Sequence, residues 1–162
     1  MIKGWVIIHK NGKLARIQKM KSFVENFLKM LVRDIFYCDL KVYYADGEYR
    51  NLFNSNCRGK IGIGSDNTPV SKDDYCLKEE IKREGIEAWE IFQVENTLYL
   101  RLSKTFSFDS SYEIWETGLF SCRYRGSGEN GDLLIARDVL ESSISVNPGD
   151  VINVTYLISI TI

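Results

Sequence analysis

The sequence predicts a mainly β protein, an antiparallel β-sandwich or jelly-roll-like domain that carries one long and one short α-helix. Two observations predict this class. In the last fourteen residues, 149–162, apolar and polar side chains alternate over a dozen positions, which is the period of a long strand with one dry face. Most of the remaining chain consists of short runs rich in β-branched and aromatic residues, separated by turns that contain Gly, Asn, Asp or Pro.

The chain has 162 residues, enough for one domain with a substantial core, and no repeat, low-complexity tract or linker divides it. We therefore expect 1–162 to form a single β-sandwich-like domain, with an N-terminal hairpin and helix, 1–37, packed on it. The net charge of −1 disfavours a nucleic-acid partner. No apolar run reaches the roughly 20 residues of a membrane helix and no leader peptide is recognisable, so we expect no membrane span and synthesis in the cytosol.

The first half of the chain predicts a hairpin and two helices. Asn11 and Gly12 lie between two strand-like runs, and both tolerate the positive φ of a type I′ turn. At 19–37 apolar residues recur at steps of three and four, which predicts the long amphipathic helix. The short helix is predicted at 75–84, because Ser71 and the acids after it suit a helix N-terminus and a glycine follows the last turn.

The other regular segments are expected to be strands. They lie at 4–9, 14–17, 40–44, 60–64, 89–94, 98–108, 112–124, 133–146 and 151–162. Loops are expected at 49–58, 65–70 and 125–132. The last strand follows a turn at 147–150 and is long and apolar, so an unpaired edge there would invite aggregation. We expect this strand to lie inside a sheet or to be completed by another subunit.

No motif in the chain predicts catalysis or cofactor binding. The Gly-Ile-Gly segment at 62–64 lacks the third glycine of the dinucleotide fingerprint, and no phosphate-binding GK[ST] loop is present. His9 is the only histidine and lies beside the hairpin turn, so neither a catalytic triad nor a zinc site is expected. We expect no catalytic residue, cofactor or metal. The cysteines are widely spaced, which favours buried free thiols and leaves disulfides as the alternative: Cys38, Cys57, Cys76 and Cys122.

Aromatic residues are numerous enough to exceed what one small core must hold, and Tyr and Trp favour interfaces. The candidates for exposure are Tyr43, Tyr44, Tyr49, Trp89, Tyr99, Tyr112, Trp115 and Tyr124. A carbohydrate-active domain is an alternative from another class. A lectin-like module would need a groove with an exposed Trp or Tyr platform. A hydrolase would need two carboxylates, such as Glu113 and Asp138, about 5–10 Å apart across a cleft.

The order of several segments between 61 and 162 resembles that of small virion proteins of tailed phages and archaeal viruses. The segments are Ile-Gly-x-Gly with a Thr-Pro loop at 61–69, Leu-x-x-Glu-Ile at 77–81 with Arg83 after it, Glu-x-Gly-Leu-Phe at 116–120, Leu-x-Ala-Arg at 134–137, and the strand after Pro-Gly-Asp at 148–150. No catalytic residues are carried over from this group. The resemblance implies a building block of a virus particle.

What the resemblance implies about function is a non-enzymatic structural subunit in a tail, adaptor or fibre-like position, found in the virion after synthesis in the host cytoplasm. It would act by oligomerisation, with copies of itself and with other virion proteins as partners. A capsid vertex or surface protein that binds a host glycan or receptor is the runner-up. The residues expected at the assembly interface are Trp89, Tyr99, Trp115, Gly118, Leu119, Phe120, Tyr156, Ile160 and Ile162.

Overall fold

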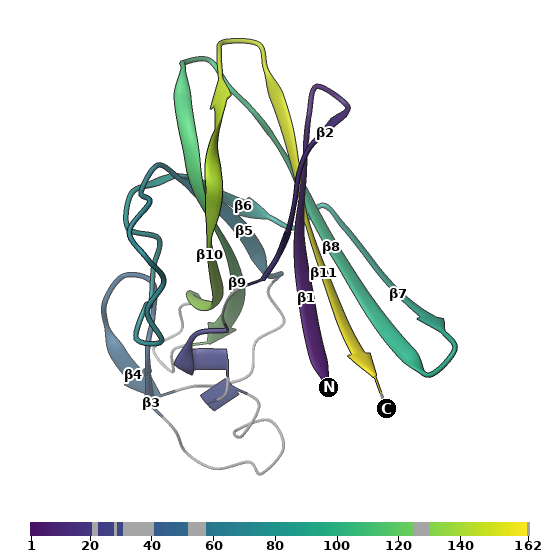
Figure 1. The fold of residues 1–162 in the computed structure, drawn as a ribbon. Helices are drawn as coiled ribbons and strands as arrows, with labels where there is room; N and C mark the ends of the chain where they lie inside the picture. Colours follow the sequence, from purple (N-terminus) through teal and green to yellow (C-terminus); the bar gives the residue numbers. More distant parts are fainter. Residues whose placement is uncertain (21–22, 28, 31–40, 52–57, 125–129, 162) are drawn as a thin grey trace.

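The computed structural model of the chain describes residues 1–20, 23–27, 29–30, 41–51, 58–124 and 130–161 (Figure 1). The fold is mainly β. The strands are β1 (Ile2–Lys10), β2 (Lys13–Lys19), β3 (Lys41–Tyr43), β4 (Tyr49–Asn51), β5 (Lys60–Gly64), β6 (Glu80–Gly85), β7 (Ala88–Val94), β8 (Thr97–Ser107), β9 (Tyr112–Tyr124), β10 (Asn130–Val146) and β11 (Val151–Thr161).

Two antiparallel sheets make up most of the structure. The five-stranded sheet has the order β2-β1-β11-β8-β7, and the four-stranded sheet has the order β10-β9-β5-β6. The hairpin of β3 and β4 forms a separate two-stranded sheet. This arrangement is consistent with a sandwich. In Figure 1 the β7–β8 hairpin extends away from the four-stranded sheet. The sheets are therefore not covered equally along their length.

The C-terminal strand β11 lies in the centre of the five-stranded sheet, where it pairs with β1 on one side and β8 on the other. The alternation of apolar and polar residues in β11 corresponds to one buried face and one partly exposed face. Ile152, Val154 and Tyr156 are fully buried, while the residues between them are only partly covered. The prediction that this strand lies inside a sheet is confirmed. Both of its edges are completed by the same chain, so it needs no strand from another subunit.

The main core lies between the two large sheets and consists of aliphatic and aromatic side chains from both. Its fully buried members include Val6, Ile8, Ile61, Ile63, Phe106, Ile114, Ala136, Ile152, Val154 and Tyr156. One polar contact crosses this core: the hydroxyl groups of Thr117 and Tyr156 share a hydrogen bond of 2.8 Å. Burial, opposed in part by this bond, raises the pKa of Tyr156 well above its ordinary value, so the phenol remains neutral.

The hairpin turn predicted at Asn11 and Gly12 is confirmed, with φ values of 48° and 77° at the two residues. The same turn is tied to the last turn of the chain. The Asn11 side-chain amide donates to the Asp150 carboxylate at 2.8 Å, and its carbonyl oxygen accepts from the Val151 amide at 2.9 Å. The bond from Asn11, with those from Asn147 and Lys10, lowers the pKa of Asp150 to about 2.

The two predicted helices are wrong in type or extent. Lys19 ends β2, and Phe23 forms a β-bridge with Ala136, so the long helix does not begin at 19. Within the described residues the only helical stretch is short, 25–27 and 29–30, and 31–37 lies outside them. The predicted short helix is absent, because 80–85 forms β6 and pairs with β5. The hydrogen-bonding edge of β5 outweighs the local helix signals there.

The loop predictions are also corrected in part. Tyr49–Asn51 forms β4, and the first residues of β10 occupy the end of the loop expected at 125–132. The remainder of both loops, 52–57 and 125–129, falls outside the described residues. Within the residues that are described, no helix is long and apolar enough to span a bilayer.

Candidate functional site

The outer face of the four-stranded sheet carries a buried ionic cluster centred on Arg137 of β10, which is fully buried. Its guanidinium donates to the Glu116 carboxylate at 2.7 Å, to Asp74 at 3.1 Å and to Asp66 at 3.1 Å. A further bond goes to the backbone carbonyl of Thr68 at 3.1 Å. Three of these four partners belong to the segment 65–79, so Arg137 fastens this segment to the sheet. We call this arrangement the arginine clamp.

The acids of the clamp are held by more than Arg137. Glu116 is fully buried and accepts hydrogen bonds from the backbone amides of Lys78 and Glu79 at 3.3 and 2.9 Å. Burial alone would raise the pKa of Asp74, but hydrogen bonds from Lys78 and Ser71 and the charge of Arg137 together hold it below its ordinary value. The clamp is thus a satisfied structural network, since every ionised group has a partner.

The glycines beneath this segment are required by close packing. A Cβ added to Gly118 would lie 2.8 Å from the Leu77 side chain, and one added to Gly64 would lie 2.5 Å from the Glu79 carbonyl oxygen. Three of the segments that carry the resemblance to virion proteins, at 61–69, 116–120 and 134–137, meet here, where Gly64, Gly118 and Arg137 hold 65–79 in position.

Replacing Gly64 by alanine is expected to lower the free energy of unfolding by about 1–3 kcal/mol, because the new methyl group meets backbone that cannot move aside cheaply. Urea denaturation measures this loss. Gly85→Ala is the matched control, since a Cβ there has no atom within 4 Å. That change should shift the free energy by no more than about 1 kcal/mol. Equal stability of the two variants would show that the close approach at Gly64 has no energetic weight.

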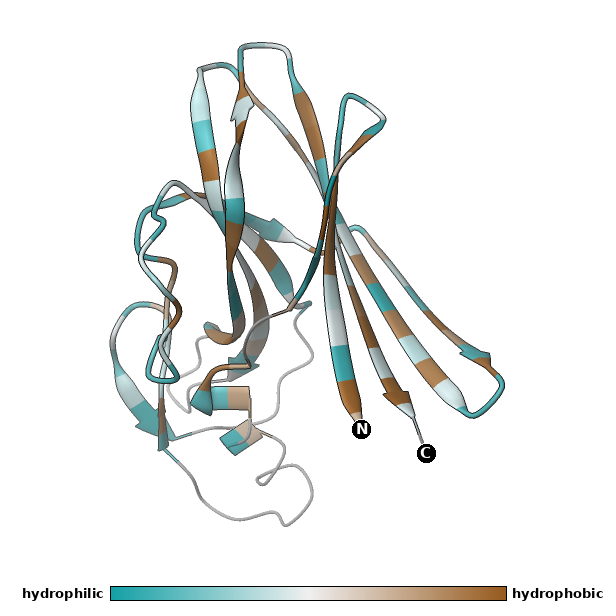
Figure 2. Ribbon diagram, viewed as in Figure 1, coloured by the Kyte–Doolittle hydropathy of each residue, from teal (hydrophilic) through white to brown (hydrophobic). Residues whose placement is uncertain are grey.

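The five-stranded sheet exposes a strip of large apolar side chains near the chain termini. These side chains lie on the same face of the sheet as the main core. The strand pairing shows this, because core residue Tyr156 lies opposite Leu102, and Leu102 lies opposite Trp89. Figure 2 shows the apolar bands that cross this end of β1, β11 and β8. We define the apolar strip by its exposed members: Ile2, Trp89, Ile91, Leu98 and Ile160. A contiguous strip of this kind is typical of an interaction surface.

Strand β7, which carries two residues of the strip, is an unprotected sheet edge. Its sequence has no proline or lysine, and its one charged residue, Glu90, is paired with Arg101 of the neighbouring strand at 2.5 Å. The other edges of the two large sheets are protected. Strand β2 carries three cations beside a β-bulge, β6 carries four charged residues, and β10 is bridged by Phe23. Edge strands without such protection pair readily with another chain.

The structure divides the predicted interface residues into three groups. Trp89 and Ile160 are exposed in the apolar strip. Tyr99 and Trp115 are half-buried, and Tyr99 stacks on Phe92 on the opposite face of its sheet. Within the chain itself, four of the predicted residues are buried, and Ile162 lies outside the described residues. The buried four are Gly118, Leu119, Phe120 and Tyr156. In the single chain these four residues are covered by internal packing.

The carboxylates considered for hydrolysis do not share an accessible site. Glu113 is exposed on β9, whereas Asp138 of β10 is fully buried. Among the described residues, no group of three metal-ligating side chains gathers in one place. Cys76 is a free thiol, as favoured, whereas Cys122 is disulfide-bonded, which was the alternative; Cys38 and Cys57 lie outside the described residues.

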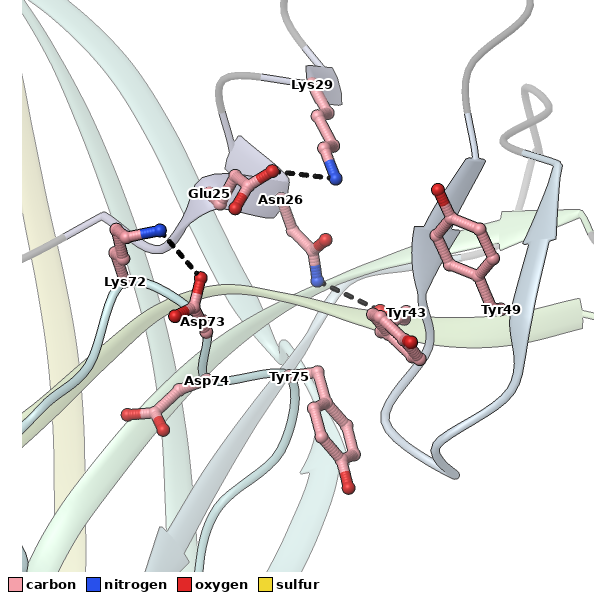
Figure 3. A pocket seen from close by; sticks show the side chains of 9 residues that line it. All are labelled: Glu25, Asn26, Lys29, Tyr43, Tyr49, Lys72, Asp73, Asp74 and Tyr75. Carbon is pink, nitrogen blue, oxygen red and sulfur yellow. Dashed lines mark hydrogen bonds and ion pairs between the residues drawn. The ribbon is translucent and has the colours of Figure 1, made fainter.

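A pocket of about 510 Å³ lies between the β3–β4 hairpin, the short helical stretch and the segment 72–75 (Figure 3). Tyr43 and Tyr49 face each other across the hairpin, with ring centroids 4.8 Å apart, and Tyr75 lies 5.6 Å from Tyr43. The alternation of β3 explains this exposure, because Val42 and Tyr44 point into a small core and Tyr43 points out. Asn26 donates to the Tyr43 carbonyl at 2.9 Å and fixes the hairpin.

Known proteins give no relative for this chain: no protein-family model, curated protein or solved structure matches it.

Proposed function

We propose that this protein is a non-enzymatic structural subunit of a virus particle, in a tail, adaptor or fibre-like position, which acts by oligomerisation. The observation that carries this proposal is the unprotected edge of β7, which continues into the apolar strip. The order of the sequence segments between 61 and 162 supports the viral assignment. Copies of the chain and other virion proteins are the expected partners.

Two further features agree with this proposal. The strands of each large sheet come from distant parts of the chain, as in the jelly-roll-like sandwich that we favour, which many particle-forming proteins use. The disulfide bond of Cys122 suits a protein that works outside the reducing cytosol, as a virion component does.

The sequence of β7 suits antiparallel pairing with a second copy of itself. A two-fold axis beside Ile91 would place Trp89 opposite Gln93 and Glu90 opposite Phe92. No like charges would then face each other, and the exposed side chains of Trp89 and Ile91 would meet those of the second copy. The two five-stranded sheets would become one continuous sheet.

Replacing Ile91 by lysine is expected to weaken self-association by about 100-fold or more, because the two-fold axis would bring two lysines together in a desolvated contact. Light scattering of purified protein over a range of concentrations measures the mass. Ile17→Lys on β2 is the matched control, since Ile17 is 58% exposed and Ile91 57% exposed. The control should retain the wild-type mass. A wild type that stays monomeric at all concentrations, or an Ile91→Lys variant with unchanged mass, would refute pairing through β7.

A further inference from the structure

The pocket defined by Tyr43, Tyr49 and Tyr75, which we call the tyrosine pocket, has no role in the assembly proposed above. It lies beside the β3–β4 hairpin, while the assembly surface lies on β7 and the terminal end of the five-stranded sheet. Its volume of about 510 Å³ falls within the range of small-molecule sites. We propose that the tyrosine pocket binds a neutral oligosaccharide.

The three tyrosine rings supply the first argument. Each is exposed by 36% to 53%, although all three lie within 6 Å of a neighbouring ring. Exposed aromatic faces in a concave site are an apolar surface that water covers in the free protein. The C–H face of a sugar ring has the same flat, apolar character, and the phenol hydroxyl groups can bond to sugar hydroxyls.

The pocket is also held in shape before a ligand arrives. Tyr43 and Tyr49 are directly paired across the hairpin, and the turn that joins their strands contains Gly47 at a φ of 84°. Tyr75 packs against this turn, since a Cβ built on Gly47 would lie 3.7 Å from its ring. A site whose aromatic rings are already in place loses little conformational entropy on binding.

The charges on the opposite side favour a neutral ligand. Figure 3 shows the tyrosines on one side of the pocket and two ion pairs on the other. Lys29 binds Glu25 at 2.8 Å, and Lys72 binds Asp73 at 3.0 Å. Each cation already has an anion, and Asp74, the third acid of the lining, is bound by Arg137 and Lys78, so the wall offers donors and acceptors without a field of one sign. A phosphate or an acidic peptide would meet the carboxylates, whereas the hydroxyl groups of a sugar can use both kinds of group.

The experiment uses the full chain and a panel of neutral oligosaccharides: cellotriose, maltotriose, N,N′,N″-triacetylchitotriose, mannotriose and lactose. Binding is followed by amide chemical shifts in NMR titrations at millimolar sugar. At least one sugar should shift the signals of pocket residues, and Tyr75→Ala should weaken its binding at least about tenfold, because the sugar loses one of the three aromatic faces on which it lies. Tyr75→Phe should retain most of the affinity.

Trp89→Ala is the control, because Trp89 is an exposed aromatic residue outside the pocket. It should bind the sugar as the wild type does, even if its mass changes, so failure of the assembly proposal and failure of this one are distinguishable. The inference is overturned if no sugar of the panel binds, or if Tyr75→Ala binds equally well. It is also overturned if a proline-rich peptide, the other ligand class that docks on aromatic grooves, occupies the pocket in place of sugars.

Discussion

Replacing Arg137 by methionine is expected to lower the free energy of unfolding by about 3–5 kcal/mol, the cost of leaving buried charges without their partner. Glu116 is fully buried and Asp74 nearly so. Glu116 accepts hydrogen bonds from Arg137 and two backbone amides, and Asp74 accepts from Arg137, Lys78 and the Ser71 amide. Methionine fills a similar volume, so the loss is electrostatic and not the result of a cavity. The segment 65–79 should then separate from the sheet more readily than the rest of the fold.

Urea denaturation gives the total loss, and amide hydrogen exchange of 65–79 reports its location. Arg101→Met is the matched control, because Arg101 forms an exposed ion pair with Glu90. Exposed pairs of this kind contribute about 1 kcal/mol or less. If both arginine variants lose the same small amount of stability, the buried clamp contributes no more than an exposed ion pair.

A chain that ends at Pro148 is expected not to fold. It lacks β11, which supplies hydrogen bonds to β1 and β8 and three fully buried core residues, Ile152, Val154 and Tyr156. Losing the central strand leaves two new open edges and exposes the core between the sheets. The expected cost exceeds the 5–15 kcal/mol that stabilises a typical domain.

Circular dichroism and the dispersion of NMR signals distinguish a folded chain from an unfolded one. A chain that ends at Ser159 is the control, because it loses only the exposed end of the strand, and it should fold. A folded Pro148 truncation would mean that β1 and β8 can pair without β11. Aggregation of the truncated chain is expected in any case, so it carries no information about assembly of the intact protein.

Much of the fold follows from local patterns in the sequence. The alternation in 149–162 and the Asn11-Gly12 turn each depend on neighbours within a few positions, and both predictions are confirmed. The prediction of a helix at 75–84 was wrong, because the residues that resemble a helix N-terminus make other contacts in the structure. Asp74 binds Arg137, which lies 63 positions later, and the residues after it complete the edge of β5. Contacts between residues so far apart in the chain cannot be recognised from the local periodicity of the sequence.

The candidate surfaces were predicted less well than the strands. Trp89 and Ile160 were among the predicted interface residues, but Ile2, Ile91 and Leu98 of the same strip were not. Their exposure depends on where the five-stranded sheet extends beyond the cover of the other sheet. The alternation of apolar residues in β7 was the sequence signal from which Ile91 could have been predicted on the same face as Trp89. Among the aromatic residues expected at the surface, Tyr44 is fully buried. Tyr75 was missed, since only the folded chain brings it to the β3–β4 hairpin.

The closeness of the two chain ends has a consequence for how the protein is made. The terminal amino group donates to the Thr161 carbonyl at 2.9 Å, across 160 positions of sequence. During translation β1 leaves the ribosome well before β11. It therefore cannot yet pair with β11, its neighbour toward the centre of the sheet. Until then β1 pairs only with β2, and the sheet that carries Val6 and Ile8 lacks its central strand. The five-stranded sheet is therefore expected to form only after β11 has been made, and the nascent chain exposes its apolar residues to chaperones until then.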